Sequence, residues 1–276
     1  MILKKFSKTT LLLGFSLALT ACVSHSNSYS NMSQSGEMQK QINLPALLSD
    51  VSLKEKLYTS TRSYEKLINL YRGVLKVLPH NDTATRNLYL YKLSQAYFDK
   101  GDNKSAILYS QPLLLVPSYK QKAMSLKLKA LIQAGNYREG LDVANELIRL
   151  NPNMADTYNS QGIAYAELGQ TTQAEKSFNK ARSYFLDDQI AINNLAMLDI
   201  VRGRYKNAVR LLLPLYLSNN KDQRVVYNLV FALIKSGDSR YALEIIKKEG
   251  LNTNGAALVN ALEDTQRISR HITSRH

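Results

Sequence analysis

Few residues of this 276-residue chain have the types and spacing that catalysis or metal binding requires. The chain has four histidines, at His25, His80, His271 and His276. No two of them have the spacing of metal ligands, and the sequence contains no HExxH, CxxC or GxSxG motif and no phosphate-binding glycine loop. The acids Asp187–Asp188 and Glu263–Asp264 are adjacent, so on a helix each pair diverges by about 100°. We therefore predict no catalytic residue, no metal site and no cofactor.

The residue with the most distinctive chemical setting is Cys22, the only cysteine of the chain. Three lysines among the first eight residues precede an apolar run from Leu11 to Ala21, which is shorter than the ~20 residues that span a bilayer. This pattern is typical of a secretory signal peptide. The letters LTAC, ending at Cys22, resemble the lipobox of bacterial lipoproteins. The resemblance implies cleavage between Ala21 and Cys22, followed by lipidation of the Cys22 thiol and amine; the alternative is an incidental cysteine.

The expected location follows from the residue after the cysteine and from the charge. Position 23 is Val23 and not aspartate, which by resemblance to bacterial sorting rules implies transfer to the outer membrane. We expect a lipid-anchored protein that faces the periplasm. Removal of the signal peptide lowers the formal net charge of +14 by three, because it contains three lysines and no acid. Such a basic protein would meet anionic lipid, cell wall or acidic protein surfaces, and we predict no nucleic-acid partner.

A strict period dominates the rest of the chain. Glycines recur every 34 residues, at Gly101, Gly135, Gly169, Gly203 and Gly237, and this period is typical of a helical solenoid. Each glycine is expected to end one helix and begin a tight turn. Asp102, Asn136 and Asp238 follow three of these glycines and are suited to cap the next helix. The fifth residue after each glycine is small, as a close crossing of two helices requires: Ala106, Gly140, Ala174, Ala208 and Ala242.

The segment YNSQGIAYAELGQTTQAEKSFNKA, from Tyr158 to Ala181, resembles the tetratricopeptide repeat over nearly its whole motif. The resemblance implies an all-α, right-handed superhelix (an α-solenoid) of about five helix-turn-helix units. Lys127 and Asp199 depart from the motif at positions that are usually apolar, and Ser110 stands in place of an aromatic residue. An irregular helical bundle is the alternative interpretation.

The domain organisation follows from this register and from composition. Residues 23–41 are rich in Ser, Asn and Gln and too poor in apolar residues to fold. We expect a signal peptide over 1–21, a lipidated flexible tether over 22–45, a divergent N-terminal helix pair over 46–86, repeats over 87–250 (87–120, 121–154, 155–188, 189–222 and 223–250), and a C-terminal capping helix with a basic tail over 251–276.

The first helix of each unit is expected to line a concave groove. Positions two, five, nine and twelve point into it, which gives a candidate peptide-binding set of Tyr91, Phe98, Lys122, Lys129, Asn159, Ile163, Asn193, Met197, Ile200, Tyr227, Phe231 and Ile234; Gln95 and Ser125 hold the same kind of position. The C-terminal half is apolar, with two asparagines available for a peptide backbone. Lys120, Lys122 and Lys129 form a basic stripe that favours an acidic partner segment. The alternative is that these side chains are partly core.

A closer resemblance concerns the order of segments. YEKLINLYRGVLKVLP before the repeats, residues 192–216 and 224–251, and the closing GAALVNAL are similar to the TadD family, the repeat lipoproteins of the tight-adherence (Tad/Flp) pilus assembly system. The resemblance implies an outer-membrane assembly factor that binds or localises the pilus secretin, as a pilotin does. Three alternatives stay open: a general lipoprotein adaptor for cell-wall enzymes, a pilotin of another type IV pilus, and an enzyme.

Overall fold

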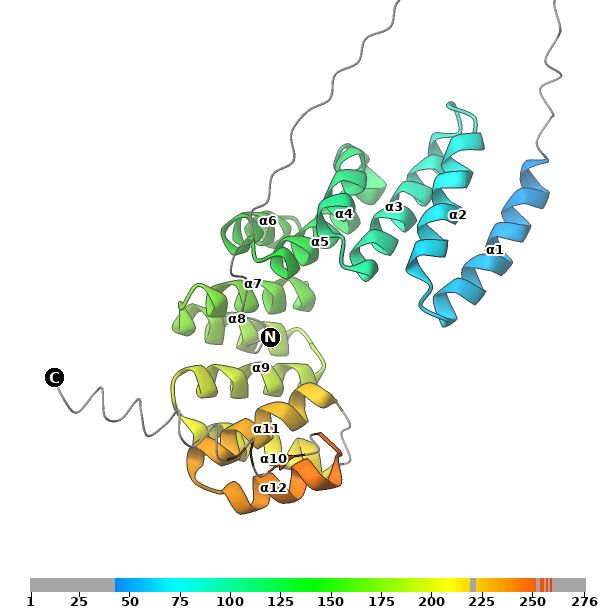
Figure 1. Ribbon diagram of the computed structural model, residues 1–276. Coiled ribbons are helices and arrows are strands. Elements are labelled where there is room, and N and C mark those ends of the chain that lie inside the picture. The colour runs from blue at the N-terminus through cyan, green and yellow to red at the C-terminus, as the bar shows by residue number, and fades with distance from the viewer. Residues whose placement is uncertain (1–42, 219–221, 252–253, 256, 258, 260–276) are drawn as a thin grey trace, which may run out of the picture. The chain divides into compact units, whose positions relative to one another are not determined.

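The computed structural model describes residues 43–218, 222–251, 254, 255, 257 and 259 (Figure 1). The described residues form twelve α-helices and no strand. The helices are α1 (Leu44–Ser60), α2 (Tyr64–Val77), α3 (Thr83–Lys100), α4 (Asn103–Ser110), α5 (Pro117–Ala134), α6 (Tyr137–Leu150), α7 (Ala155–Glu167), α8 (Thr171–Ser183), α9 (Asp188–Val201), α10 (Tyr205–Leu217), α11 (Gln223–Ser236) and α12 (Ser239–Lys248). The expected signal peptide, Cys22, most of the expected tether and the basic tail lie outside the described residues.

The helices pack in the order of the chain, and two layers follow from their contacts. Each helix contacts the next, which makes successive helices antiparallel neighbours (Figure 1). The first helices of the units, α3, α5, α7, α9 and α11, also contact one another in sequence. Within the described part, the second helices α4, α6, α8, α10 and α12 make no such contacts with each other. The first helices therefore form the inner layer, and the prediction of an all-α chain of stacked helix pairs is confirmed.

The periodic glycines end the first helices by the expected mechanism. All five have positive φ, between 72° at Gly203 and 97° at Gly237. At Gly101 the backbone N–H groups of Gly101 and Asp102 donate to the carbonyls of Phe98 and Tyr97, which closes the last turn. A Cβ on Gly101 would meet no atom within 4 Å, so backbone conformation and not space requires glycine there.

Two of the three predicted caps are present. The carboxylate of Asp102 accepts from the backbone N–H of Ser105 at 3.1 Å, and that of Asp238 accepts from Tyr241 at 3.3 Å. The prediction for Asn136 is wrong, because its side chain makes no capping hydrogen bond to α6.

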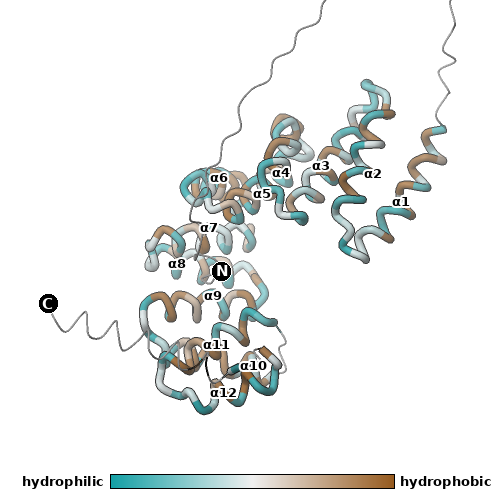
Figure 2. Tube along the Cα trace, in the orientation of Figure 1, coloured by the Kyte–Doolittle hydropathy of each residue, from teal (hydrophilic) through white to brown (hydrophobic). Residues whose placement is uncertain are grey.

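Small residues allow each pair of helices to cross closely. Ala106, Ala174, Ala208 and Ala242 are fully buried, as the motif predicts. In α7, Gly162 faces the ring of Phe178 in α8 so closely that a Cβ would lie 2.5 Å from Cδ1 and Cε1 of that ring. Apolar residues recur along every helix (Figure 2), and those that face neighbouring helices form the buried core. No helix in the described part is both long and apolar enough to span a bilayer.

Prolines account for two departures from the regular unit. The second helix of the first unit stops at Ser110 and continues as the 3-10 helix η2, Gln111–Leu115, with Pro112 near its start. Proline lacks the N–H group that an α-helix needs in its interior, so the chain tightens at this point. Pro117 begins α5 four residues before position 121, because its fixed φ and missing donor suit a first helical position.

The two ends of the stack are closed by different elements. At the N-terminal end, Glu55 of α1 accepts from Tyr71 of α2 at 3.0 Å and pairs with Lys92 of α3 at 2.7 Å. At the other end, Val259 is buried in the core of α9 to α12. A Cβ on Gly255 would approach Ile246 of α12 to 2.8 Å, so the backbone there lies directly on α12.

Candidate functional site

The inner layer carries most of the candidate groove residues at accessible positions. Lys122, Lys129 and Tyr227 are exposed, and six further members of the set are half-buried: Tyr91, Phe98, Asn159, Ile163, Met197 and Phe231. Three assignments are wrong, because these side chains are buried. Asn193 is 8 % exposed, Ile200 6 % and Ile234 1 %, and the two isoleucines belong to the core formed by α9 to α12. The two isoleucines hold the twelfth position of their units, whereas Phe98 at the same position of the first unit is half-buried.

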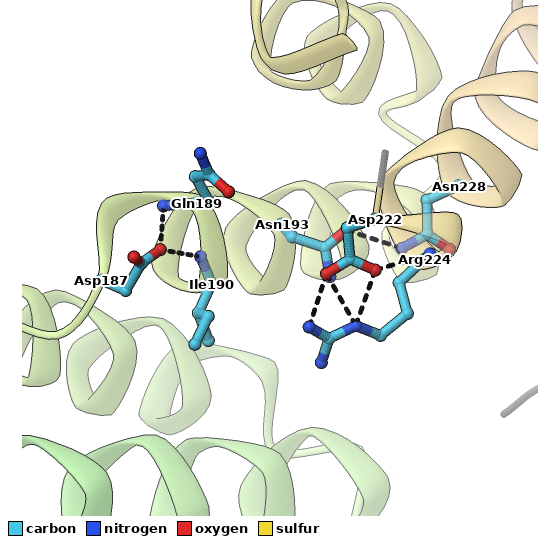
Figure 3. Close-up of polar contacts among 7 residues, drawn as sticks. All are labelled: Asp187, Gln189, Ile190, Asn193, Asp222, Arg224 and Asn228. Atoms are coloured by element: carbon cyan, nitrogen blue, oxygen red, sulfur yellow. Dashed lines mark hydrogen bonds and ion pairs between the residues drawn. The ribbon is translucent and has the colours of Figure 1, made fainter. Parts of the chain in front are cut away.

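The two groove asparagines have a structural task that the sequence did not reveal. The side-chain amide of Asn194 donates to Oδ1 of Asn159 at 2.6 Å, which joins α7 to α9. The amide of Asn228 donates to Oδ1 of Asn193 at 3.0 Å, which joins α9 to α11 (Figure 3). The prediction that these asparagines bind a peptide backbone did not include these bonds, each of which uses one acceptor position of the amide oxygen. The bonds tie the first helices of successive units together.

The starts of α9 and α11 are fixed by capping aspartates (Figure 3). Oδ1 of Asp187 accepts from the backbone N–H groups of Gln189 at 2.9 Å and Ile190 at 3.2 Å. Asp222 accepts from the backbone N–H of Arg224 at 2.9 Å and pairs with its guanidinium at 2.6 Å. The hydrogen bond from the Arg224 side chain lowers the pKa of the Asp222 carboxyl. Arg224, at the second position of its unit, is thus paired with the residue that caps its own helix.

A pocket of about 170 Å³ opens between α3, α5 and the start of α7. Five of its lining residues are predicted inward-facing positions: Tyr91, Gln95, Lys122, Ser125 and Lys129. Gln121, Leu126 and Met154 complete the lining. Met154 could not be found from the repeat register because it precedes the first position of its unit and serves as the N-cap residue of α7.

The electrostatics of this pocket are basic but partly balanced. Lys129 pairs with Asp156 at 3.6 Å, and outside the pocket Lys120 pairs with Glu146 at 3.7 Å. Lys122 has no carboxylate within ion-pair distance among the described residues, and its ammonium lies 5.8 Å from the centre of the Tyr119 ring. Desolvation, followed by the charge of Asp99, raises the pKa of Tyr91, which keeps this hydroxyl neutral. The pocket therefore presents one free cation beside a neutral aromatic wall.

Ser125 adds an unusual feature to the pocket. Its hydroxyl oxygen is shielded from solvent and has no hydrogen-bond partner within the described part of the chain. An unpaired buried hydroxyl costs about 1–3 kcal/mol, so such groups are uncommon away from functional sites. Across the described ranges, no group of three or more His, Cys, Asp or Glu side chains is placed to hold a metal ion.

Comparison with known proteins identifies the architecture. No family model matches the chain, and no curated protein matches its sequence. A thermophilic TPR protein from Thermus thermophilus is similar in structure, with a TM-score of 0.55 and 21 % identity over 68 % of this chain and 99 % of its own. A tetratricopeptide repeat protein from Parabacteroides merdae gives a TM-score of 0.61 and 16 % identity over 80 % of this chain and 88 % of its own. The fold is a tetratricopeptide-repeat solenoid.

A third similar structure is that of a Rap protein complexed with competence and sporulation factor. Its TM-score is 0.56 and its identity 14 %, over 81 % of this chain and 70 % of its own. At this level of identity the likeness concerns the tetratricopeptide-repeat fold and not a shared ligand.

Proposed function

We propose that this tetratricopeptide-repeat chain is a non-catalytic scaffold whose inner layer binds a segment of another protein. The observation that carries the proposal is the continuous inner layer of five contacting helices, with accessible Tyr, Phe, Met and Lys side chains along it. Accessible aromatic and apolar side chains gathered along one layer favour a protein partner. The similar Rap structure contains a bound factor, which supports a binding role for this architecture.

The cellular setting that we propose rests on the sequence. The lipobox-like residues before Cys22, with Val23 after it, favour a lipid-anchored protein of the outer membrane that faces the periplasm. The similarity of segment order to the TadD family favours a role in assembly of a Tad/Flp pilus. On this proposal the partner is the pilus secretin, which the scaffold binds or localises.

Cross-linked pull-down of tagged full-length protein from outer membranes tests the proposal, with Cys22→Ala as the mislocalised control. We expect an identified secretin among the cross-linked proteins, and its loss in the control. A deletion strain should lack surface fibres and adherence. Enrichment of cell-wall enzymes without a secretin, together with envelope defects on deletion, would replace the pilus role with that of a general adaptor.

A second variant separates binding from localisation. Tyr227 and Phe231 lie one turn apart on α11 and are accessible on the inner layer. Replacing both with Ala should leave the protein in the outer membrane and lower secretin recovery. The matched control is Leu108→Ala with Leu150→Ala, since both leucines are exposed on second helices. If the inner-layer variant recovers as much secretin as the control variant does, the binding surface lies elsewhere.

A further inference from the structure

The pocket between α3, α5 and α7 is too small for most small-molecule ligands. Its volume is about 170 Å³, whereas sites for cofactors and drug-sized molecules usually occupy about 300–1,000 Å³. A space of this size suits one side chain of a longer ligand. Because the pocket lies on the inner layer, that ligand is a chain segment that crosses α3 and α5.

The charges at the pocket select the side chain. Lys122 is an exposed cation without an acidic partner among the described residues, and Lys129 stands seven residues later on the same helix face. The Lys129–Asp156 pair is long, at 3.6 Å, and its side chains are 47 % and 69 % exposed. Exposed pairs of this kind contribute little to stability, so a ligand carboxylate readily replaces Asp156. Both ammonium groups are then available to one acid.

Ser125 lies between the two lysines in the sequence of α5 and also lines the pocket. Its hydroxyl oxygen is buried without a partner among the residues that the structure describes. Rotation about the single Cα–Cβ bond moves a serine hydroxyl between staggered positions, and one of these can supply a donor to a ligand oxygen. An incoming carboxylate thus satisfies a group that is unsatisfied in the free protein.

We propose that this pocket binds the carboxylate of an aspartate or glutamate in an extended partner segment. Lys122 and Lys129 neutralise the acid and the Ser125 hydroxyl donates to it, while the half-buried Met154 contacts an apolar neighbour in the segment. This inference rests on the proposed function, because it assigns a residue class to the partner of the inner layer.

An array of extended ten-residue peptides tests the inference with the purified full chain. Each peptide carries Glu, Gln or Lys at its centre, flanked by Leu or by Gly, and fluorescence anisotropy then measures affinity for the selected sequences. We expect Glu peptides with a Leu neighbour to bind best, and Glu→Gln in the peptide to weaken binding about tenfold, as expected for loss of a charge-assisted contact. Raising the salt concentration should reduce this preference.

Variants assign the preference to the pocket. Lys122→Gln with Lys129→Gln should bind the Glu and Gln peptides equally, and Ser125→Ala should lower the affinity for Glu more than that for Gln. The matched control is Lys127→Gln, on the same helix but paired with Glu139 at 3.1 Å and outside the pocket. Peptide binding without a preference for Glu, or a preference that survives in the double variant, would overturn the inference and leave the scaffold function intact. No binding by any peptide would also overturn the inference, whereas the scaffold function is overturned only if the cross-linked pull-down recovers no protein partner.

Discussion

The contact between Gly162 and Phe178 gives the sharpest test of how this stack is packed. A Cβ at Gly162 would lie 2.5 Å from two ring carbons of Phe178 and 3.0 Å from Cζ. Ordinary carbon contacts are about 3.5–4.0 Å, so the ring must move by about 1 Å. The ring cannot swing into solvent without leaving the core, because Phe178 is only 2 % exposed.

The free-energy change of Gly162→Ala has two opposing terms. Overpacking a core costs about 1–3 kcal/mol. Ala is favoured over Gly inside a helix by about 1 kcal/mol, and this offsets part of that cost. We expect Gly162→Ala to be destabilised by about 1 kcal/mol. With a urea slope of about 2 kcal/mol/M, the unfolding midpoint should fall by about 0.5 M when followed by circular dichroism at 222 nm.

Two glycines in other helices are matched controls. Gly73→Ala in α2 meets no atom within 4 Å, so it should stabilise the protein by about 1 kcal/mol. Gly140→Ala in α6 meets the mobile end of Ile132, Cδ1 at 2.8 Å, and should be close to neutral. Combining Gly162→Ala with Phe178→Leu should cost less than the sum of the single changes. A stabilised Gly162→Ala protein, or strict additivity, would refute the packing argument.

Three further predictions concern other contacts. Tyr216→Phe removes the hydrogen bond of 2.9 Å to Glu249. Burial, and after it this hydrogen bond, raises the pKa of Tyr216 to about 12 in the folded protein. The protein with Tyr216 should therefore be more stable than Tyr216→Phe below pH 10 and lose this difference as the pH rises through 12, which urea unfolding across this range would show. Phe185 has φ of 64° and is 96 % exposed, so Phe185→Gly should raise the urea midpoint by relieving about 1 kcal/mol of backbone strain; a lower midpoint would reveal a stabilising role for the ring. Glu55→Gln removes the ion pair to Lys92 and should speed amide hydrogen exchange in α1 alone, whereas faster exchange throughout would contradict the local role given to Glu55.

The sequence was sufficient to predict where the helices end, but not to predict which of the candidate groove residues are exposed. Period and glycine chemistry specify where a helix ends, so the turns at Gly101 and Gly237 follow from sequence alone. The exposure of the groove positions depends on the packing around each unit, and packing within α9 to α12 buries Ile200 and Ile234. Packing of α11 beside α9 likewise brings Asn228 within hydrogen-bond distance of Asn193, 35 residues away. A single unit's pattern contains no information about such contacts between units.

Pro112 illustrates a second limit. A repeat register assigns the same helix to every unit, and it gave no reason to expect an interruption in the first. The proline residue itself contains that signal, since it removes a donor in a helix interior. Pro214 shows that the outcome still depends on context, because α10 continues through it.

The unequal layers of the stack have a mechanical consequence. The first helices touch one another, and side-chain amides join α7 to α9 and α9 to α11, whereas each second helix within the described chain contacts its neighbouring first helices and no other second helix. The spacing of the first helices is therefore set by direct contact, whereas the spacing of the second helices is set through the first helix that packs between them. A ligand that spans several units meets side chains that recur once in each unit. The spacing of the ligand's own anchoring side chains therefore contributes to recognition together with their chemistry.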